Sequence, residues 1–339
     1  MDQFLSGKYE TLVPPLERNV DASTISYGVQ EELQSEADRL LEKGVELYQI
    51  RDYSLAISTF ENACELYAQL DDFVGQGRAL EGLGLAEYAL GNYGRAIKVS
   101  QQCLAIARQI GDRRIERQAL SNLGNAYRHT QDYDKAIRYK HESLHVAQEI
   151  EDRRGIAAAF NNLGMVYKII DDHASAISYY QKSLEMAREL SDISVESQVL
   201  RNLGNAYHAM GNHSKTIECY EHLLAITREL DDQRAQMHIL KNLGSTCYTM
   251  GDYLRAIAFQ QQRLEISRNL NDQRNEMQTL ESLGVIFDVV GNQNQALDYF
   301  EQRLDVARQI NDEKLKQQAV SSLKMLCYAV GDYARASQY

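Results

Sequence analysis

One short pattern in the sequence has the spacing of a metal-dependent hydrolase. In His141-Glu142-Ser143-Leu144-His145 the two histidines are four residues apart, so on a helix they lie one turn apart and could hold zinc, with Glu142 as general base. In neighbouring 40-residue units the same two positions hold Gln, Glu or Ala, and no later His or Glu is spaced to complete the site. The pattern is therefore more typical of a polar helix surface, and a hydrolase stays only an alternative function.

No other catalytic motif is present. The sequence contains no GxSxG and no GxxxxGK[ST], and no GxGxxG is followed by a ribose-binding acid. Paired carboxylates such as Asp231-Asp232 are expected to be solvated helix caps. We therefore predict a protein that is not an enzyme and that needs no cofactor and no metal.

Composition narrows the possible partners. The 339 residues include 36 Lys and Arg against 48 Asp and Glu, a net charge of −12, which argues against general nucleic-acid binding. No apolar run reaches the roughly 18 residues of a membrane span, and Met1–Lys8 lacks the pattern of a secretory signal. The five scattered cysteines are expected to be reduced and mostly buried. These features predict a cytoplasmic protein, and the two prolines predict that it is mostly helical.

A 40-residue repeat dominates the sequence. Within each unit an Asp or Asn, a small residue and a second Asp keep the same register as a Leu-Gly pair. The pairs are Leu83-Gly84, Leu123-Gly124, Leu163-Gly164, Leu203-Gly204, Leu243-Gly244 and Leu283-Gly284. Apolar spacing predicts two helices per unit, a helix A over about 113–130 and a helix B over about 133–150 in the third. Gly124 and Ala136 are expected where these helices cross closely.

Together Asn122-Leu123-Gly124-Asn125-Ala126-Tyr127, Asp132-Tyr133 and Ala136-Ile137 resemble a tetratricopeptide repeat. The 40-residue length and Gly111-Asp112-Arg113-Arg114 are similar to the Partner-of-Inscuteable family and to cyanobacterial long-repeat proteins. The resemblance implies an all-α, right-handed superhelical solenoid of about eight two-helix repeats with the last one truncated, and it implies protein partners.

The repeat register predicts the domain organisation. Residues 1–30, with Pro14 and Pro15, are expected to be an extended or disordered arm that could occupy the groove. Residues 31–339 are expected to be the solenoid. Lys324 replaces the repeat glycine of the last unit, whose helix B is short, so homo-oligomerisation through this unit is a further prediction. The predicted units are about 32–71, 72–111, 112–151, 152–191, 192–231, 232–271, 272–311 and 312–339.

In such arrays helix A lines the concave face, which makes its exposed side the candidate binding site. Four central units place a cation there, at Arg128, Lys168, Arg201 and Lys241, with no carboxylate at the same positions. A concave cationic wall steers anionic segments inward. Asn residues two positions before each glycine could hold a ligand backbone. The predicted peptide-binding residues are Asn122, Asn125, Arg128, Asn162, Lys168, Arg201, Asn202, Asn205, His208, His238, Lys241, Asn242 and Tyr248.

Arg201, Asn205 and Asn242 also match part of the carboxylate clamp of co-chaperone tetratricopeptide domains. Gln278 and Ser282 stand where that clamp has its next cations, so chaperone-tail binding is disfavoured. The sequence predicts a non-enzymatic adaptor or scaffold that binds an extended or helical, acidic segment of a partner protein. A signalling regulator that clamps a whole folded partner is the main alternative.

Overall fold

The computed structural model describes residues 22–339, which form sixteen α-helices and no strand. The all-α prediction is confirmed for this part of the chain. The chain divides into two compact units, Met1–Ala126 and Tyr127–Tyr339, and the division lies inside α5. The first helices are α1 (Ala22–Gln49), α2 (Tyr53–Gln69), α3 (Phe73–Ala89), α4 (Tyr93–Ile110) and α5 (Arg113–His129).

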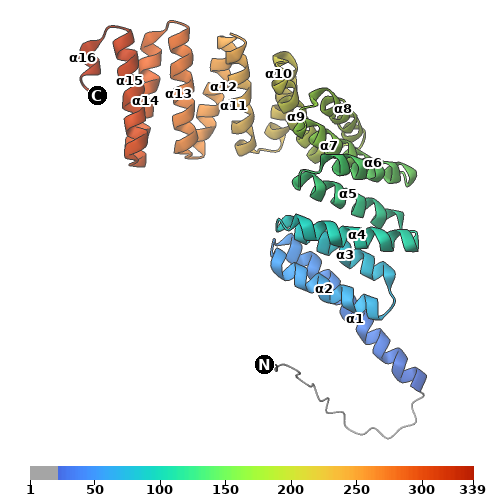
Figure 1. Cartoon of the computed structure of the whole chain (residues 1–339). Helices are drawn as coiled ribbons and strands as arrows, with labels where there is room; N and C mark the ends of the chain where they lie inside the picture. The colour runs from blue at the N-terminus through green and yellow to red at the C-terminus, as the bar shows by residue number, and fades with distance from the viewer. Residues whose placement is uncertain (1–21) are drawn as a thin grey trace, which may run out of the picture. The chain divides into compact units, whose positions relative to one another are not determined.

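Helices α6 to α16 belong to the second unit. Within each unit consecutive helices run antiparallel and stack side by side, so that odd-numbered helices are helix A of a repeat and even-numbered ones helix B (Figure 1). Their bounds are α6 (Tyr133–Glu149), α7 (Arg153–Ile169), α8 (His173–Glu189), α9 (Ile193–Ala209), α10 (His213–Glu229), α11 (Gln233–Thr249), α12 (Tyr253–Asn269), α13 (Gln273–Val289), α14 (Gln293–Ile310), α15 (Glu313–Ala329) and α16 (Tyr333–Ala336).

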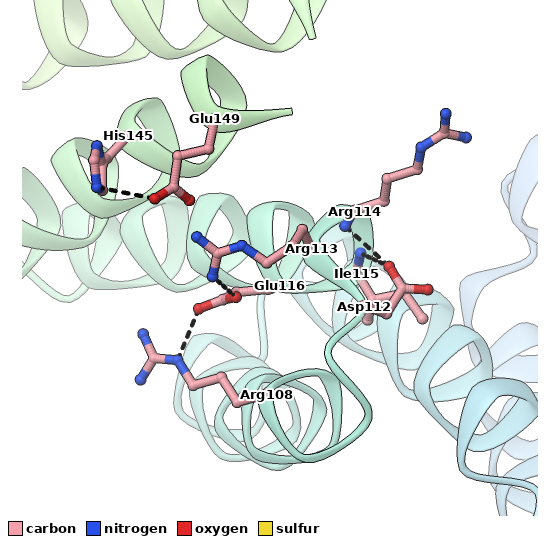
Figure 2. Close-up of polar contacts among 8 residues, drawn as sticks. All are labelled: Arg108, Asp112, Arg113, Arg114, Ile115, Glu116, His145 and Glu149. Carbon is pink, nitrogen blue, oxygen red and sulfur yellow. Dashed lines mark hydrogen bonds and ion pairs between the residues drawn. The ribbon is translucent and has the colours of Figure 1, made fainter. Parts of the chain in front are cut away.

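The repeated Asp and Asn residues set where the helices begin. Asp112 Oδ1 accepts hydrogen bonds from the backbone N–H groups of Arg114 and Ile115, at 2.9 and 3.0 Å (Figure 2). This N-cap satisfies amides that have no partner inside the helix. A residue with left-handed backbone precedes the cap, Gly111 at φ 73° or Gln131 at φ 63°. Left-handed turn and cap together end one helix and start the next within three residues.

The first helix is longer than predicted. Residues 22–30 were expected to belong to an extended or disordered arm, but α1 is helical from Ala22, ten residues before the first predicted unit begins at about residue 32. From Gly28 on, Ala37 is the first fully buried side chain of α1. Residues 1–21, with the predicted arm and both prolines, lie outside the described residues.

Each repeat is held together where helix B crosses helix A over the repeat glycine. In the second unit Tyr180 packs on Gly164, Tyr220 on Gly204 and Phe300 on Gly284. A Cβ added to Gly164 would lie 2.6 Å from the Tyr180 ring. Glycine therefore lets the two backbones approach while the ring fills the space between them.

The five cysteines are free thiols, as predicted, and four of them are buried. Cys64 is half-buried. Burial, with Glu61 and Glu65 nearby, raises its pKa to about 12. Burial likewise raises the pKa of Cys103 to about 12. At neutral pH both are therefore protonated, poorly nucleophilic thiols that serve as small core side chains.

We expect Gly164→Ala to lower the free energy of unfolding by about 1–3 kcal/mol, because its Cβ would overlap the Tyr180 ring. Gly94→Ala in α4 is the control. An added Cβ there meets nothing within 4 Å, so a gain of up to about 1 kcal/mol is expected. Urea denaturation followed by circular dichroism measures both, and equal effects would contradict the proposed role of the glycine.

Tyr180 and Tyr220 occupy equivalent positions but differ in how their hydroxyls are used. The Tyr220 hydroxyl donates to Asn205 Oδ1 at 2.7 Å, whereas the buried Tyr180 hydroxyl has no partner in the described chain. Tyr220→Phe is therefore expected to cost about 1 kcal/mol and Tyr180→Phe to be neutral or stabilising. The reverse order of urea midpoints would count against this assignment.

Candidate peptide-binding site

Two odd-numbered helices of neighbouring repeats in the second unit contact one another directly. Helix α7 contacts α9 in the second unit, and Asn202 Nδ2 donates to Asn161 Oδ1 at 2.9 Å between them. Helix A of one repeat thus lies against helix A of the next, as expected for the narrower side of a curved stack. We call the exposed surface of α7, α9, α11, α13 and α15 the inner face.

The predicted site residues divide between the two units. Asn122 and Asn125 belong to the first unit and the other eleven to the second, so the second unit alone is considered as the site. Its inner face carries Lys168, Arg201 and Lys241, the last two exposed. None of these three forms an ion pair with a residue of the described chain. Arg128 Nη2 lies 3.0 Å from His129 Nε2.

Several predicted amides hydrogen-bond inside the protein. Besides the Asn202–Asn161 bond, the Tyr220 hydroxyl donates to Asn205 and is also hydrogen-bonded by Asn242. Asn162 is half-buried on α7. Asn202, Asn205 and Asn242 therefore hydrogen-bond to other side chains of the protein. Only the donors and acceptors that these bonds leave unused can serve a ligand.

Residues four positions after the glycine pack on the start of the next helix. The ring of His208 lies 6.0 Å from that of His213, and the ring of Tyr248 lies 5.7 Å from that of Tyr253. Both His208 and Tyr248 stay exposed on their other side. They form the edge of the inner face at the A–B turn.

The structure brings Arg201, His238 and Asn242 together around a pocket of about 460 Å³, which we call the basic pocket. Arg201 comes from α9, and His238 and Asn242 from α11, while Tyr220 and Leu223 of α10 form its apolar wall. Arg234, which the sequence analysis did not select, adds a second guanidinium. Asp232 is the one acid in the lining, and its Oδ1 already accepts the Ala235 N–H at 2.9 Å.

One repeat later the equivalent space holds a side chain of the protein itself. Arg263 takes the position of Leu223 and is 2% exposed. Its Nη2 donates to Asn275 Oδ1 at 2.7 Å and to Gln278 Oε1 at 3.3 Å. Burial lowers the pKa of Arg263 from its usual value. The basic pocket is open because Leu223 is too short to fill it in this way.

Exposed apolar residues continue the inner face along α11 to α15, and of these the sequence analysis identified only Tyr248. They lie one, four and five positions after the repeat glycine and extend the inner face beyond the basic pocket. The signal was present in the sequence, since the position one residue after the repeat glycine changes from Asn205 and Ser245 to Val285 and Met325. The residues are Tyr248, Val285, Val289, Met325 and Tyr328.

The HExxH histidines lie on α6. His145 Nε2 is 3.3 Å from Glu149 Oε1 (Figure 2), and the His141 ring makes an edge contact with Tyr179. Burial lowers the pKa of His141. Within residues 22–339 no three His, Cys, Asp or Glu side chains are grouped as metal ligands. The second histidine is thus engaged by a carboxylate one turn further along its own helix.

Family models agree with this architecture. Models described as tetratricopeptide repeat match residues 41–109, 116–189 and 196–269, together more than half of the chain. The chain therefore belongs to the tetratricopeptide repeat family, and its fold is a tetratricopeptide-repeat solenoid. No curated protein matches the sequence. The closer likeness to Partner-of-Inscuteable proteins stays a prediction, as does cytoplasmic location.

Solved structures with the same fold are distant in sequence. BtubC from P. vanneervenii has 20% identity and a TM-score of 0.55, over 71% of this chain and 92% of its own. A signal transduction ATPase with a tetratricopeptide repeat sensor from Pyrococcus horikoshii has 17% identity and a TM-score of 0.64, over 92% of this chain. This chain spans 46% of that protein's length. In the described region no helix is both long and apolar enough to cross a bilayer.

Replacing Arg263 tests whether its side chain only fills the space that is open, as the basic pocket, in the preceding repeat. Arg263→Leu is expected to leave the free energy of unfolding unchanged or to raise it by up to about 2 kcal/mol, because the cost of burying a guanidinium disappears and Leu fits the equivalent place in the preceding repeat. Arg303→Leu is the comparison. It removes the cation 3.1 Å from Glu281 and is expected to destabilise. A loss above about 2 kcal/mol in Arg263→Leu would contradict this reading.

Proposed function

We propose that the second unit is a non-enzymatic adaptor that binds an extended or helical segment of another protein along its inner face, with an acidic group of that segment in the basic pocket. The observation that carries the proposal is the convergence of Arg201, Arg234 and His238 on one open pocket. Neither guanidinium forms an ion pair within the described chain.

The electrostatic setting supports an anionic ligand. The chain as a whole is acidic, yet the lining of this pocket carries two arginines against one aspartate. A guanidinium presents paired donors that match a carboxylate. Beside the pocket the inner face turns apolar at Tyr248 and Val285. The favoured segment therefore carries an acidic residue followed by apolar residues.

Reversing one charge tests the proposal. A displayed library of random dodecapeptides is selected on the wild-type protein, and the affinity of recovered peptides is measured by fluorescence anisotropy. Recovered peptides are expected to be enriched in Asp or Glu, to bind Arg201→Glu at least about tenfold more weakly, which corresponds to about 1.4 kcal/mol, and to weaken as salt is raised.

Lys98→Glu is the matched control, since it makes the same change in net charge at an exposed site on α4. Its affinity for the selected peptides should stay within twofold of the wild type. An equal loss of peptide affinity in both variants would mean that net charge alone explains the effect. Selection of peptides without Asp or Glu would contradict the proposed acidic ligand.

A further inference from the structure

A second pocket opens on the inner face one repeat beyond the basic pocket. In the second unit an aromatic ring covers Gly164, Gly204 and Gly284, but Gln260 covers Gly244. A glutamine amide is smaller than a phenyl or phenol ring, so part of the space that a ring fills elsewhere stays open. A pocket of about 340 Å³ lies there, between α11, α12 and α13, which we call the amide pocket.

The Gln260 side chain at the base of this pocket lacks partners. Gln260 is 2% exposed, and its Oε1 is buried without a hydrogen bond to any described residue. Its Nε2 faces the Cα of Gly244 and makes no hydrogen bond within the described chain either. Buried amides are normally paired, so this side chain leaves both a donor and an acceptor unused by the described chain.

Two hydroxyl groups of the lining already use their donors inside the protein. The hydroxyl of Ser282 donates to the Gln278 carbonyl at 2.9 Å, and that of Thr249 donates to the Ser245 carbonyl at 3.0 Å. Both donors are used, while lone pairs on both oxygens remain free. The carboxylate of Glu281 adds further acceptor capacity at the pocket rim.

The charge of Glu281 is compensated. Arg303 Nη2 lies 3.1 Å from its Oε1, and the Glu281 side chain is 45% exposed. A carboxylate ligand has no N–H or O–H to donate to Gln260 Oε1, and an ammonium group could not accept from the Gln260 amide. A neutral group that both donates and accepts fits best, and Tyr248 and Val285 flank it with apolar surface.

We propose that the amide pocket takes the carboxamide side chain of an Asn or Gln residue in the bound segment. Its C=O accepts from Gln260 Nε2, one N–H donates to Gln260 Oε1, and the second N–H donates to an oxygen of Ser282 or Glu281. This subsite rests on the proposed peptide-binding function. Because α11 lines both pockets, the carboxamide follows or precedes the acidic residue at a fixed spacing.

The same dodecapeptide library tests the subsite, selected in parallel on the wild type and three variants. Gln260→Phe restores the ring that Gly284 meets in Phe300, and Gln260→Leu removes the amide while leaving more space. Gln261→Leu is the matched control, because Gln261 is the exposed neighbour on the same helix. Circular dichroism establishes that each variant is folded, and either Gln260 variant suffices if the other does not fold.

Wild type and Gln261→Leu are expected to enrich Asn or Gln at one peptide position, and both Gln260 variants to lose that preference while keeping the acidic one. Replacing the selected Asn or Gln by Ala should weaken binding to the wild type about tenfold and to Gln260→Phe less than twofold. Acidic peptides without a carboxamide preference, or a preference that survives in the Gln260 variants, would overturn the subsite alone. If the wild type selects no peptide, the proposed function fails together with the subsite.

Discussion

The close approach of helix B to the glycine of helix A is the constraint on which the rest of the structure depends. It fixes the distance between the two helices of a repeat, and a single side chain of helix B fills the gap. Tyr180, Tyr220 and Phe300 do so with a ring. Lys140 and Gln260 occupy the same position with polar groups. Burial, together with the charge of Arg128, holds the pKa of Lys140 well below its usual range. Substitutions at this position therefore alter the floor of the inner face.

The fold was predictable because the repeat marks it many times. In the third unit the predicted helices, 113–130 and 133–150, agree with α5 and α6 to within one residue, since each helix ends at a left-handed residue and the next begins at an Asp or Asn cap. The early start of α1 was not predictable in this way, because residues 22–30 precede the first repeat unit and lie outside the 40-residue register. In the repeats a capping Asp or Asn marks where each helix begins, whereas no such residue of the repeat register marks the start of α1.

The site was only partly predictable. Position in the repeat identified Arg201, His238 and Asn242, which the structure places around one pocket. It could not show that Asn202 bonds to Asn161 or that Tyr220 engages Asn205, because these contacts join different helices. Each pocket is lined by side chains from three helices, and it is open only where those side chains differ from the equivalent ones in other repeats. The residues that all repeats share therefore do not predict where a pocket lies.

Charge is distributed differently on the two kinds of helix. Acidic and basic residues on even-numbered helices pair from one repeat to the next, 34 residues apart, as in Arg95–Glu61, Arg255–Glu221 and Arg335–Glu301. Lys168, Arg201 and Lys241 on the inner face have no such pairs within the described chain. An acidic chain can thus keep unpaired cations in one place, because its carboxylates are held elsewhere by helix caps and by pairing between repeats.

Two positions beneath the inner face decide where a ligand could enter. At one of them Leu223 leaves the basic pocket open, and Arg263 fills the same space in the next repeat with hydrogen bonds to Asn275 and Gln278. At the other Tyr220 covers its glycine, and Gln260 opens the amide pocket over the next one. Neither change alters the helix surface. Ligand specificity in such an array can therefore evolve through buried residues, while the repeat that maintains the fold stays unchanged.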